Sequence, residues 1–363
     1  MQHDRSAFSR RHFAQLLGAG AAVAAFPTLV TRAANGAPVL LNSNENSNGP
    51  SPAALRALRE ASADVFRYPD DAESALIEAV AAHHGVSTDE VVLGNGSSDI
   101  LRLAAFAFPG RLVTADPTFE ALWRHYRGSD VVKVPLDGSY AHDLAKMRAA
   151  AGDAALVYVC NPNNPTATIT PKASLRAFLD AVPAGVTVLV DEAYHHYAQS
   201  GDYESVMPLV KSKPNLIVAR TFSKVYAMAG LRLGYAIAQK PLIAKLAAQQ
   251  AFNAINLLAA VAGRASLLDT EHVVVSRKRN AETRAWVAGE LQRAGYRILP
   301  SEANFVMIDL GTEVRPVIQA FRERGVHVGR VFPALPKHLR VTIGTMEEMK
   351  RFVEAFGAIT SAR

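Results

Sequence analysis

The chain of 363 residues contains a single cysteine, Cys160, and therefore has no intrachain disulfide framework. It has no Pro/Gly/Ser-rich linker, no low-complexity tract and no internal repeat, which excludes solenoids and strings of small domains. After residue 34, no segment is apolar for long enough to span a bilayer. With 49% hydrophobic and 20% charged residues, the composition is that of an ordinary globular protein with a sizeable core.

The amino-terminal segment has the layout of an export signal. Two arginines, Arg10 and Arg11, precede an apolar Ala/Gly-rich run at residues 17–30, and small residues follow. The pattern Ser-Arg-Arg-x-Phe-x-x-Leu that starts at Ser9 resembles the twin-arginine (Tat) type of signal. The alternative is a basic surface patch before a buried helix. We expect residues 1–34 to be a signal peptide of a protein that folds in the cytoplasm and is then exported to the periplasm.

The charge of the mature chain is lower than the composition suggests. The formal net charge is +6, but residues 1–34 hold four arginines and one aspartate, which leaves about +3 for the rest. We find no nucleic-acid-binding signature. We therefore expect small-molecule partners, no nucleic acid, and no membrane attachment of the mature form.

Short β-branched runs alternate with helix-length amphipathic stretches between about residues 64 and 260. The runs are Val91–Leu93, Leu112–Ala115, Val131–Val134, Leu156–Cys160, Val186–Val190, Leu216–Ala219 and Gly234–Ala238. Seven apolar strands separated by helices predict an α/β domain with a mostly parallel, buried sheet. We expect residues 64–260 to form this large domain.

A smaller α+β domain is expected from residues 35–63 and 261–363. Its predicted elements are a long helical stretch over Leu257–Ala294, a strand over Asn304–Ile308, a helix over Val314–Glu323, strands near Val326–Val328 and Leu339–Ile343, and a closing helix. Ser51 and Pro52 begin an earlier helix, and Thr345–Glu348 is a capping box at the start of the last one.

Polar residues follow four of the predicted strands. They lie in Gly94–Asp99, Asn161–Thr166, Asp191–Tyr194 and Arg220–Lys224. In open parallel sheets, ligands bind beyond the carboxyl ends of the strands. Together these segments offer a phosphate-sized loop, an amide, a carboxylate, a phenol and an amine, which are the groups needed to hold an anionic aromatic aldehyde.

Each of these segments has another interpretation when it is taken alone. Gly94–Asp99 puts N–H groups and hydroxyls at a helix N-terminus, where phosphate binds, but most such turns are plain turns. It is neither a dinucleotide fingerprint nor a P-loop. Asp191 could pair with a protonated pyridine nitrogen, cap a helix or join an internal ion pair. Lys224 could be a surface lysine, although its neighbours Phe222 and Val225 are apolar.

Six segments occur in the order found in a known enzyme family. They are Asn44-Glu45-Asn46, Arg67-Tyr68-Pro69-Asp70, Asn161–Thr166, Asp191–Tyr194, Thr221–Lys224 followed by Ala229–Gly234, and Leu339–Thr345. Together they resemble the class I/II, fold-type I aminotransferases that depend on pyridoxal 5′-phosphate (PLP), and within these the histidinol-phosphate aminotransferase group. The resemblance spans residues 39–356. It implies a fold-type I α/β architecture, with a mostly parallel seven-stranded sheet between helices in a large domain and a smaller α+β domain.

The resemblance also implies a role for each residue of the site. Lys224 would form a Schiff base with PLP and then move the proton, Asp191 would pair with the pyridinium nitrogen, and Tyr194 would hydrogen-bond the ring hydroxyl. The other residues implied to bind PLP are Gly96, Ser97, Ser98, Phe119, Asn164, Thr221, Ser223, Arg232 and, from a second subunit, Tyr68. The residues implied to contact substrate are Asn44, Arg330 and Arg340. A homodimer with shared active sites follows from the implied role of Tyr68.

Several positions depart from the family pattern. Ser47 replaces a proline, Ala167 replaces a glycine, and Ser98 replaces an acidic residue of the phosphate loop. The family's Val-Arg pair is replaced by Val328-Gly329-Arg330, which moves the arginine by one position. These changes concern substrate recognition more than PLP binding.

We therefore predict an aminotransferase that moves an amino group between an amino acid or amine and a 2-oxo acid such as 2-oxoglutarate, by ping-pong kinetics through pyridoxamine phosphate. The donor would be histidinol-phosphate-like, aromatic or another amino acid. Two alternatives stay open, a PLP-dependent decarboxylase or lyase and a non-catalytic exported binding protein. His195-His196 lack metal-ligand spacing, so we predict no metal. His83-His84 end a predicted helix, where a cation suits the dipole.

Overall fold

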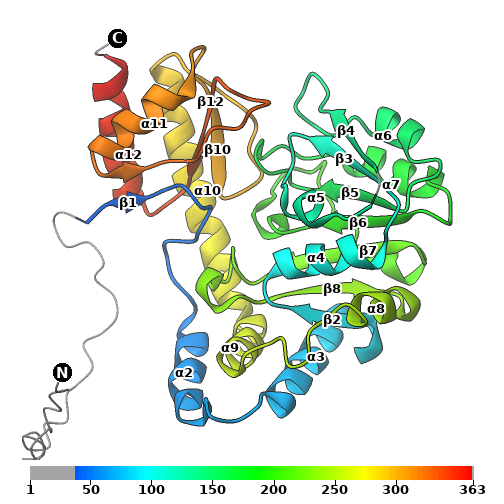
Figure 1. Cartoon of the computed structure of the whole chain (residues 1–363). Coiled ribbons are helices and arrows are strands. Elements are labelled where there is room, and N and C mark those ends of the chain that lie inside the picture. The colour runs from blue at the N-terminus through cyan, green and yellow to red at the C-terminus, as the bar shows by residue number, and fades with distance from the viewer. Residues whose placement is uncertain (1–36, 129, 362–363) are drawn as a thin grey trace, which may run out of the picture. The chain divides into compact units, whose positions relative to one another are not determined.

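A seven-stranded sheet lies at the centre of the part of the chain that the structure, a computed structural model, describes: residues 37–128 and 130–361 (Figure 1). The strand order is β2-β8-β7-β6-β5-β3-β4. The strands are β2 (Val91–Gly94), β3 (Arg111–Asp116), β4 (Asp130–Pro135), β5 (Leu156–Cys160), β6 (Thr187–Asp191), β7 (Leu216–Thr221) and β8 (Gly234–Ala238). β8 is antiparallel to both of its neighbours, and the other four pairs are parallel. The predicted α/β sheet is confirmed. The predicted signal peptide lies outside the described residues.

Helices cover both faces of this sheet because successive strand residues point to opposite faces. On β5, Val157 and Val159 belong to one apolar core, whereas Leu156 and Tyr158 belong to another. The helices that pack on the first core are α2 (Pro52–Ala61), α3 (Asp70–His84), α6 (Leu144–Ala150), α7 (Lys172–Ala181) and α9 (Leu257–Leu268). Those that pack on the second are α4 (Ser97–Ala107), α5 (Ala121–His125) and α8 (Lys240–Ala247). Short 3-10 helices span Ser62–Asp64, Thr88–Glu90, His195–Tyr197, Met207–Lys211 and Ala229–Leu231.

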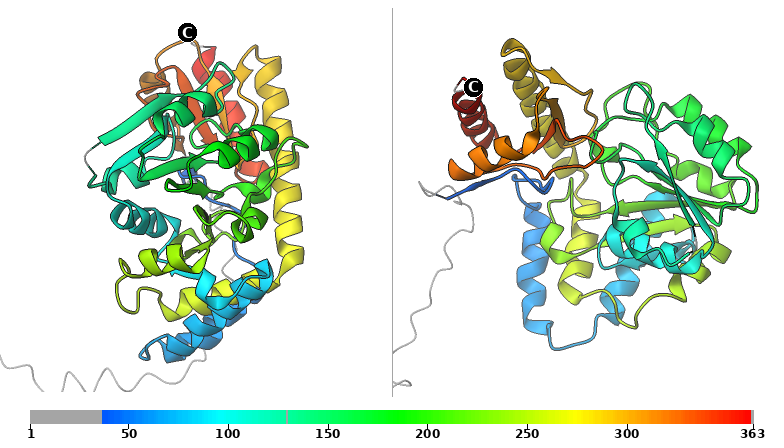
Figure 2. Two further views of the ribbon diagram at one scale, coloured as in Figure 1. Left: turned by 90° about the vertical axis from the view of Figure 1, so that its right-hand side faces the viewer. Right: turned by 45° about the horizontal axis from the view of Figure 1, so that its top comes forward.

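The last elements of the chain lie together with β1 beside the central sheet (Figure 2). They share a third apolar core. An antiparallel sheet has the order β12-β10-β9, and β1 pairs with β11 in parallel. The elements are β1 (Val39–Leu40), α10 (Thr270–Arg293), β9 (Arg297–Ile298), β10 (Phe305–Asp309), α11 (Val314–Glu323), β11 (Val326–His327), β12 (His338–Thr342) and α12 (Met346–Thr360). The rings of Phe321 and Phe352 stack with their centroids 5.3 Å apart. The predicted capping box of Thr345 and Glu348 is confirmed at the start of α12.

The prediction of one helical stretch over Leu257–Ala294 is wrong. The chain forms two helices there, α9 and α10, which are separated at Asp269. The Asp269 side chain accepts a hydrogen bond from the backbone N–H of His272 and is the N-cap of α10. A carboxylate in this position satisfies an N–H group that has no partner within the helix, so it favours the start of a new helix.

Residues 37–62 pack in two places. Val39 and Leu41 belong to the third core, because β1 pairs with β11. Helix α2 instead packs against α9, and its Ala54 is buried in the first core. The predicted domain boundaries at residues 63 and 260 stay a prediction. Within the described residues, no helix is long and apolar enough to cross a membrane.

Candidate active site

A cavity of about 670 Å³ lies at the carboxyl ends of β5, β6 and β7. Its walls include most of the site residues predicted from the sequence. These are Asn44, Ser97, Ser98, Phe119, Asn164, Asp191, Tyr194, Thr221, Ser223, Lys224, Arg232, Arg330 and Arg340. Asp191 is the last residue of β6 and Thr221 the last of β7. The parallel sheet therefore gathers polar groups that are far apart in the sequence.

Lys224 lies just beyond β7, with its amino group at the N-terminal segment of the described chain. Its Nζ donates to the carbonyl oxygens of Asn44, at 2.9 Å, and Ser43, at 3.2 Å. Burial, and secondarily the positive charge of Arg340, lower the pKa of Lys224 to about 8. Roughly a tenth to a quarter of this amine is therefore neutral between about pH 7 and pH 7.5, and this fraction is able to act as a nucleophile.

The lowered pKa of Lys224 predicts a specific pH dependence of its reactivity. In the apoprotein, acylation of Lys224 by acetic anhydride should be half-maximal near pH 8, because only the neutral amine reacts. Exposed lysines in the same digest should need about pH 10.4 and serve as internal standards. Peptide mass spectrometry across a pH series measures both, and a Lys224 profile that follows the standards would contradict the assignment.

Asp191 is a buried carboxylate at the floor of the cavity. Its Oδ2 accepts a hydrogen bond from the Tyr158 hydroxyl at 3.0 Å, and its Oδ1 accepts one from the backbone N–H of Ala193 at 3.1 Å. Burial raises the pKa of Asp191 to about 6. A cation bound beside it would favour the ionised form, so this position suits a protonated ring nitrogen.

Tyr194 is held by two amide side chains. Its hydroxyl oxygen accepts from Asn44 Nδ2 at 3.0 Å and from Asn164 Nδ2 at 3.2 Å. With both acceptor sites used, the Tyr194 proton is available to a third group. Asn44 itself has a left-handed backbone, with φ of 54°, and its N–H donates to Thr342 Oγ1. The side chain of Asn44, which was predicted to contact substrate, thus hydrogen-bonds Tyr194 and orients it.

Hydroxyls and a guanidinium form an anion cradle beside the N-terminus of α4. The cradle consists of Ser97, Ser98, Thr221, Ser223 and Arg232. Gly96 does not line the cavity, but it makes the cradle possible, since a Cβ there would lie 2.2 Å from Arg232 Nη2. Helix N–H groups, hydroxyls and one arginine are the donor set that a phosphate group needs. The cradle, Asp191 and Lys224 therefore fit the three ends of PLP.

The sequence profile of the family described as "Aminotransferase class I and II" matches residues 37–356. The chain belongs to this family. Histidinol-phosphate aminotransferase from Symbiobacterium thermophilum is 43% identical over 88% of this chain and 90% of that protein. Aromatic amino acid aminotransferase from Rhodococcus jostii is 39% identical over 90% of this chain and 91% of that protein. The crystal structure of histidinol-phosphate aminotransferase from Sinorhizobium meliloti in complex with pyridoxal 5′-phosphate has a TM-score of 0.84, with 27% identity and coverage of 90% and 91%.

Membership of this family confirms the predicted fold-type I architecture, the predicted PLP cofactor and the predicted aminotransferase activity. An amino donor and a 2-oxo acid are the substrates of such enzymes. PLP fits this cavity because the anion cradle, the buried carboxylate of Asp191 and the Lys224 amine, whose pKa is lowered, line the same space.

Tyr68 does not line the cavity of its own chain. Its side chain is 79% exposed, and the neighbouring Phe66 and Val65 are also exposed. Its predicted contact with PLP would thus have to be made in another subunit.

Sequence reasoning missed about half of the cavity wall. The lining residues to which the sequence assigned no individual role are Asn42, Ser43, Glu45, Thr118, Glu120, Cys160, Ala193, Ala229, Ile318, Gln319, Arg322, His327, Val328, Gly329 and Phe332. Those of α11 and β11 carry no local motif and reach the site only through the fold. Cys160 lines the cavity, but burial raises the pKa of its thiol, which disfavours the nucleophilic thiolate.

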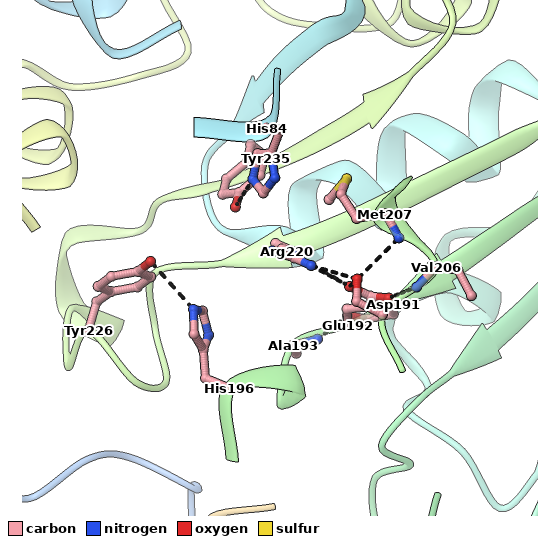
Figure 3. Close-up of polar contacts among 11 residues, drawn as sticks. His84, Asp191, Glu192, Ala193, His196, Val206, Met207, Arg220, Tyr226 and Tyr235 are labelled. Carbon is pink, nitrogen blue, oxygen red and sulfur yellow. Dashed lines mark hydrogen bonds and ion pairs between the residues drawn. The ribbon is translucent and has the colours of Figure 1, made fainter. Parts of the chain in front are cut away.

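A buried ion pair joins the ends of β6 and β7 beneath the site (Figure 3). Glu192 Oε2 accepts from Arg220 Nη2 at 2.8 Å and Nε at 3.1 Å. Glu192 also accepts from the Ser205 hydroxyl and the Val206 N–H, each at 2.7 Å. Glu192 follows Asp191 in the chain and Arg220 precedes Thr221, so this pair links the two strand ends that carry these cavity residues.

The histidines near this pair are neutral, and the expectation of a cation at the end of α3 is wrong. His84 Nε2 lies 2.9 Å from the Tyr235 hydroxyl (Figure 3). Burial, and next the charge of Arg220, lower the pKa of His84 to about 3. Burial likewise lowers the pKa values of His195 and His196. Among the residues that the structure describes, no three His, Cys, Asp or Glu side chains gather as a metal site would require.

Proposed function

We propose that this cavity binds PLP and transfers an amino group from an amino acid or amine to a 2-oxo acid. The observation that carries the proposal is the convergence of Lys224, Asp191 and the anion cradle on one cavity. In this assignment the cradle binds the phosphate, Asp191 faces the ring nitrogen, and Phe119 lies against the ring. Tyr194 donates its free proton to the ring hydroxyl, with support from Asn164.

When bound, PLP supplies an electron sink for the bonds of the substrate Cα. Asp191, as a carboxylate, keeps the ring nitrogen protonated, which that chemistry needs. Lys224 supplies an amine that is partly neutral near pH 8. Once free, this amine would take the proton from the substrate Cα and deliver it to the aldehyde carbon of the cofactor. Arg340 lines the cavity, and its Nη1 and Nη2 donate to the uncharged Asn164 Oδ1 and Asn42 carbonyl oxygen, so its positive charge is offered to the anionic group of the substrate.

The half-reaction provides the test. The purified protein with PLP, mixed with L-glutamate and no acceptor, should release at most about one 2-oxoglutarate per site, because ping-pong transfer stops until a 2-oxo acid is added. Coupled detection with glutamate dehydrogenase and a parallel measurement of CO₂ distinguish the alternatives. Release of CO₂ would favour the decarboxylase, and no product with any amine of a broad panel would favour the binding protein.

The names of the relatives support two classes of amino donor. Histidinol-phosphate aminotransferases provide one class and an aromatic amino acid aminotransferase provides the other. Both classes combine an amine with an aromatic ring and an anionic group. They differ in that anionic group, which is a phosphate in the first and a carboxylate in the second.

We further propose a homodimer with shared active sites, in which Tyr68 completes the cradle of the partner. The exposure of Tyr68, Phe66 and Phe252, whose side chain is 93% exposed, supports a covered surface in an assembly. Tyr68→Ala and Lys224→Ala variants should each be weakly active alone. After unfolding and refolding together, they should regain about a quarter of wild-type activity, since half of the dimers would hold one intact site. The proposal would be contradicted if the refolded mixture showed no more activity than the two variants measured separately, or if light scattering showed a monomer.

Export through the Tat route is also proposed, on the arginine pair at residues 10 and 11. A route that carries folded proteins would allow PLP to be loaded in the cytoplasm. It would place the enzyme in the periplasm, away from a cytoplasmic supply of histidinol phosphate. Amino-terminal sequencing of periplasmic protein should begin near residue 35, and retention of the uncleaved chain in the cytoplasm would contradict it.

A further inference from the structure

Glu120 lines the active-site cavity and holds Arg330 in an ion pair. Arg330 Nη2 lies 2.6 Å from Glu120 Oε1, and the same oxygen lies 2.6 Å from Arg124 Nη2. The Glu120 side chain is 20% exposed, whereas those of Arg330 and Arg124 are 50% and 59% exposed. Glu120 therefore compensates part of the charge of Arg330 on the wall of the cavity, since it shares its single negative charge with the more exposed Arg124.

The backbone at Gly329 explains why the arginine stands at position 330. The Gly329 N–H donates to the carbonyl oxygen of Arg340 at 2.8 Å. A Cβ at Gly329 would lie 2.6 Å from that oxygen and 3.0 Å from the Arg340 Cβ. No side chain fits there without a shift of the backbone, so the arginine side chain is displaced by one residue and reaches Glu120.

Arg330 and Arg340 lie at the same end of the cavity, on either side of Phe332 in the sequence. Their Cζ atoms lie 4.5 Å and 5.1 Å from the centroid of the Phe332 ring. Arg340 donates to Asn164 Oδ1 and to the carbonyl oxygen of Asn42, and its Nε has no partner among the described residues. At this end, the hydrogen bonds of Arg340 go to uncharged acceptors, whereas the charge of Arg330 is paired with a carboxylate.

We propose that Glu120 is a specificity-determining residue that adapts the cavity to amino donors with a carboxylate rather than a phosphate. The inference rests on the proposed function and names its substrate class. A carboxylate carries one charge, which Arg340 matches, whereas a phosphate monoester carries about −1.5 to −2 at pH 7 and needs a second cation. Arg330 would have to leave Glu120 to supply it, and the carboxylate of Glu120 would then repel the phosphate. Arg322 also lines the cavity, but its side chain is exposed and its charge is screened by solvent.

L-histidine and L-histidinol phosphate form a matched pair of donors for the test, because they share the amine and the imidazole and differ in the anionic group. L-phenylalanine is a second carboxylate donor. With 2-oxoglutarate as acceptor and PLP saturating, the wild-type kcat/KM for the better carboxylate donor should exceed that for the phosphate donor by about tenfold or more. Glu120→Gln should raise the phosphate-to-carboxylate ratio by about fivefold or more, because it releases Arg330 and removes the repulsion. Arg124→Gln, which removes only the outer ion pair of Glu120, should change this ratio by less than about twofold.

A double variant tests whether Glu120 acts through Arg330. In the Glu120→Gln background, Arg330→Gln should cancel most of the gain, whereas in the wild type Arg330→Gln should change the ratio little. The proposal is overturned if the wild type prefers the phosphate donor, if Glu120→Gln leaves the ratio unchanged, or if the gain survives the loss of Arg330. Turnover of none of the three donors would instead speak against the proposed function, so the two failures are distinguishable.

Discussion

The Lys224→Ala variant is expected to lose at least about 10⁴-fold in kcat for the transfer from L-glutamate to a 2-oxo acid. In the proposed function two roles of Lys224 would disappear together, the nucleophile that bonds to the cofactor and the base that moves the proton. The neighbouring carbonyl groups of Ser43 and Asn44 cannot replace either role, because amide carbonyl oxygens are poor nucleophiles and are too weakly basic to take up the proton. Single-turnover release of 2-oxoglutarate measures the effect.

An exposed lysine provides the matched control for this variant. The Lys278 side chain is 75% exposed on α10, so Lys278→Ala should leave the rate within about twofold of the wild type. Equal thermal midpoints of the two variants would show that Lys224→Ala is folded. A folded Lys224→Ala variant that keeps more than about a hundredth of the wild-type rate would remove Lys224 from the reaction.

The Arg220→Met variant is expected to lose about 3–5 kcal/mol in the free energy of unfolding. Glu192 is 1% exposed, and without Arg220 its carboxylate would be buried beside only the neutral donors Ser205 and Val206. Removal of one partner of a buried pair leaves an uncompensated charge, which costs more than the pair itself contributes. Urea unfolding of the PLP-free protein measures the loss without a contribution from cofactor binding.

A solvent-exposed pair elsewhere in the chain gives the contrast. Arg176 and Glu204 are 46% and 45% exposed, so Arg176→Met should cost no more than about 1 kcal/mol. The double variant with methionine at both Glu192 and Arg220 should be more stable than Arg220→Met alone, because no buried charge remains. Equal losses for the buried and the exposed pair would contradict the account given for Glu192.

The central sheet could be predicted because each strand contains a short local run of mostly apolar residues, several of them β-branched. β5 and β8 have the predicted limits, and the other five strands differ by one or two residues at their ends. The break at Asp269 was missed because the helical pattern continues on both sides of it, and a single side chain hydrogen bond to His272 decides the boundary. Weak periodic signals of this kind do not reveal which of several polar residues is a cap.

The sequence by itself determined the family and the cofactor, and it led to the hypothesis that Lys224, Asp191 and Tyr194 act in the site, because these residues belong to short motifs at strand ends. Only the tertiary structure decided that Asn44 orients Tyr194, that Glu192 and Arg220 form a buried pair, and that Glu120 holds Arg330. The partners in these contacts are 150, 28 and 210 residues apart in the chain. These contacts depend on the order of the strands and on how β12 and residues 42–44 lie against the carboxyl ends of the sheet strands, which local residue patterns do not encode.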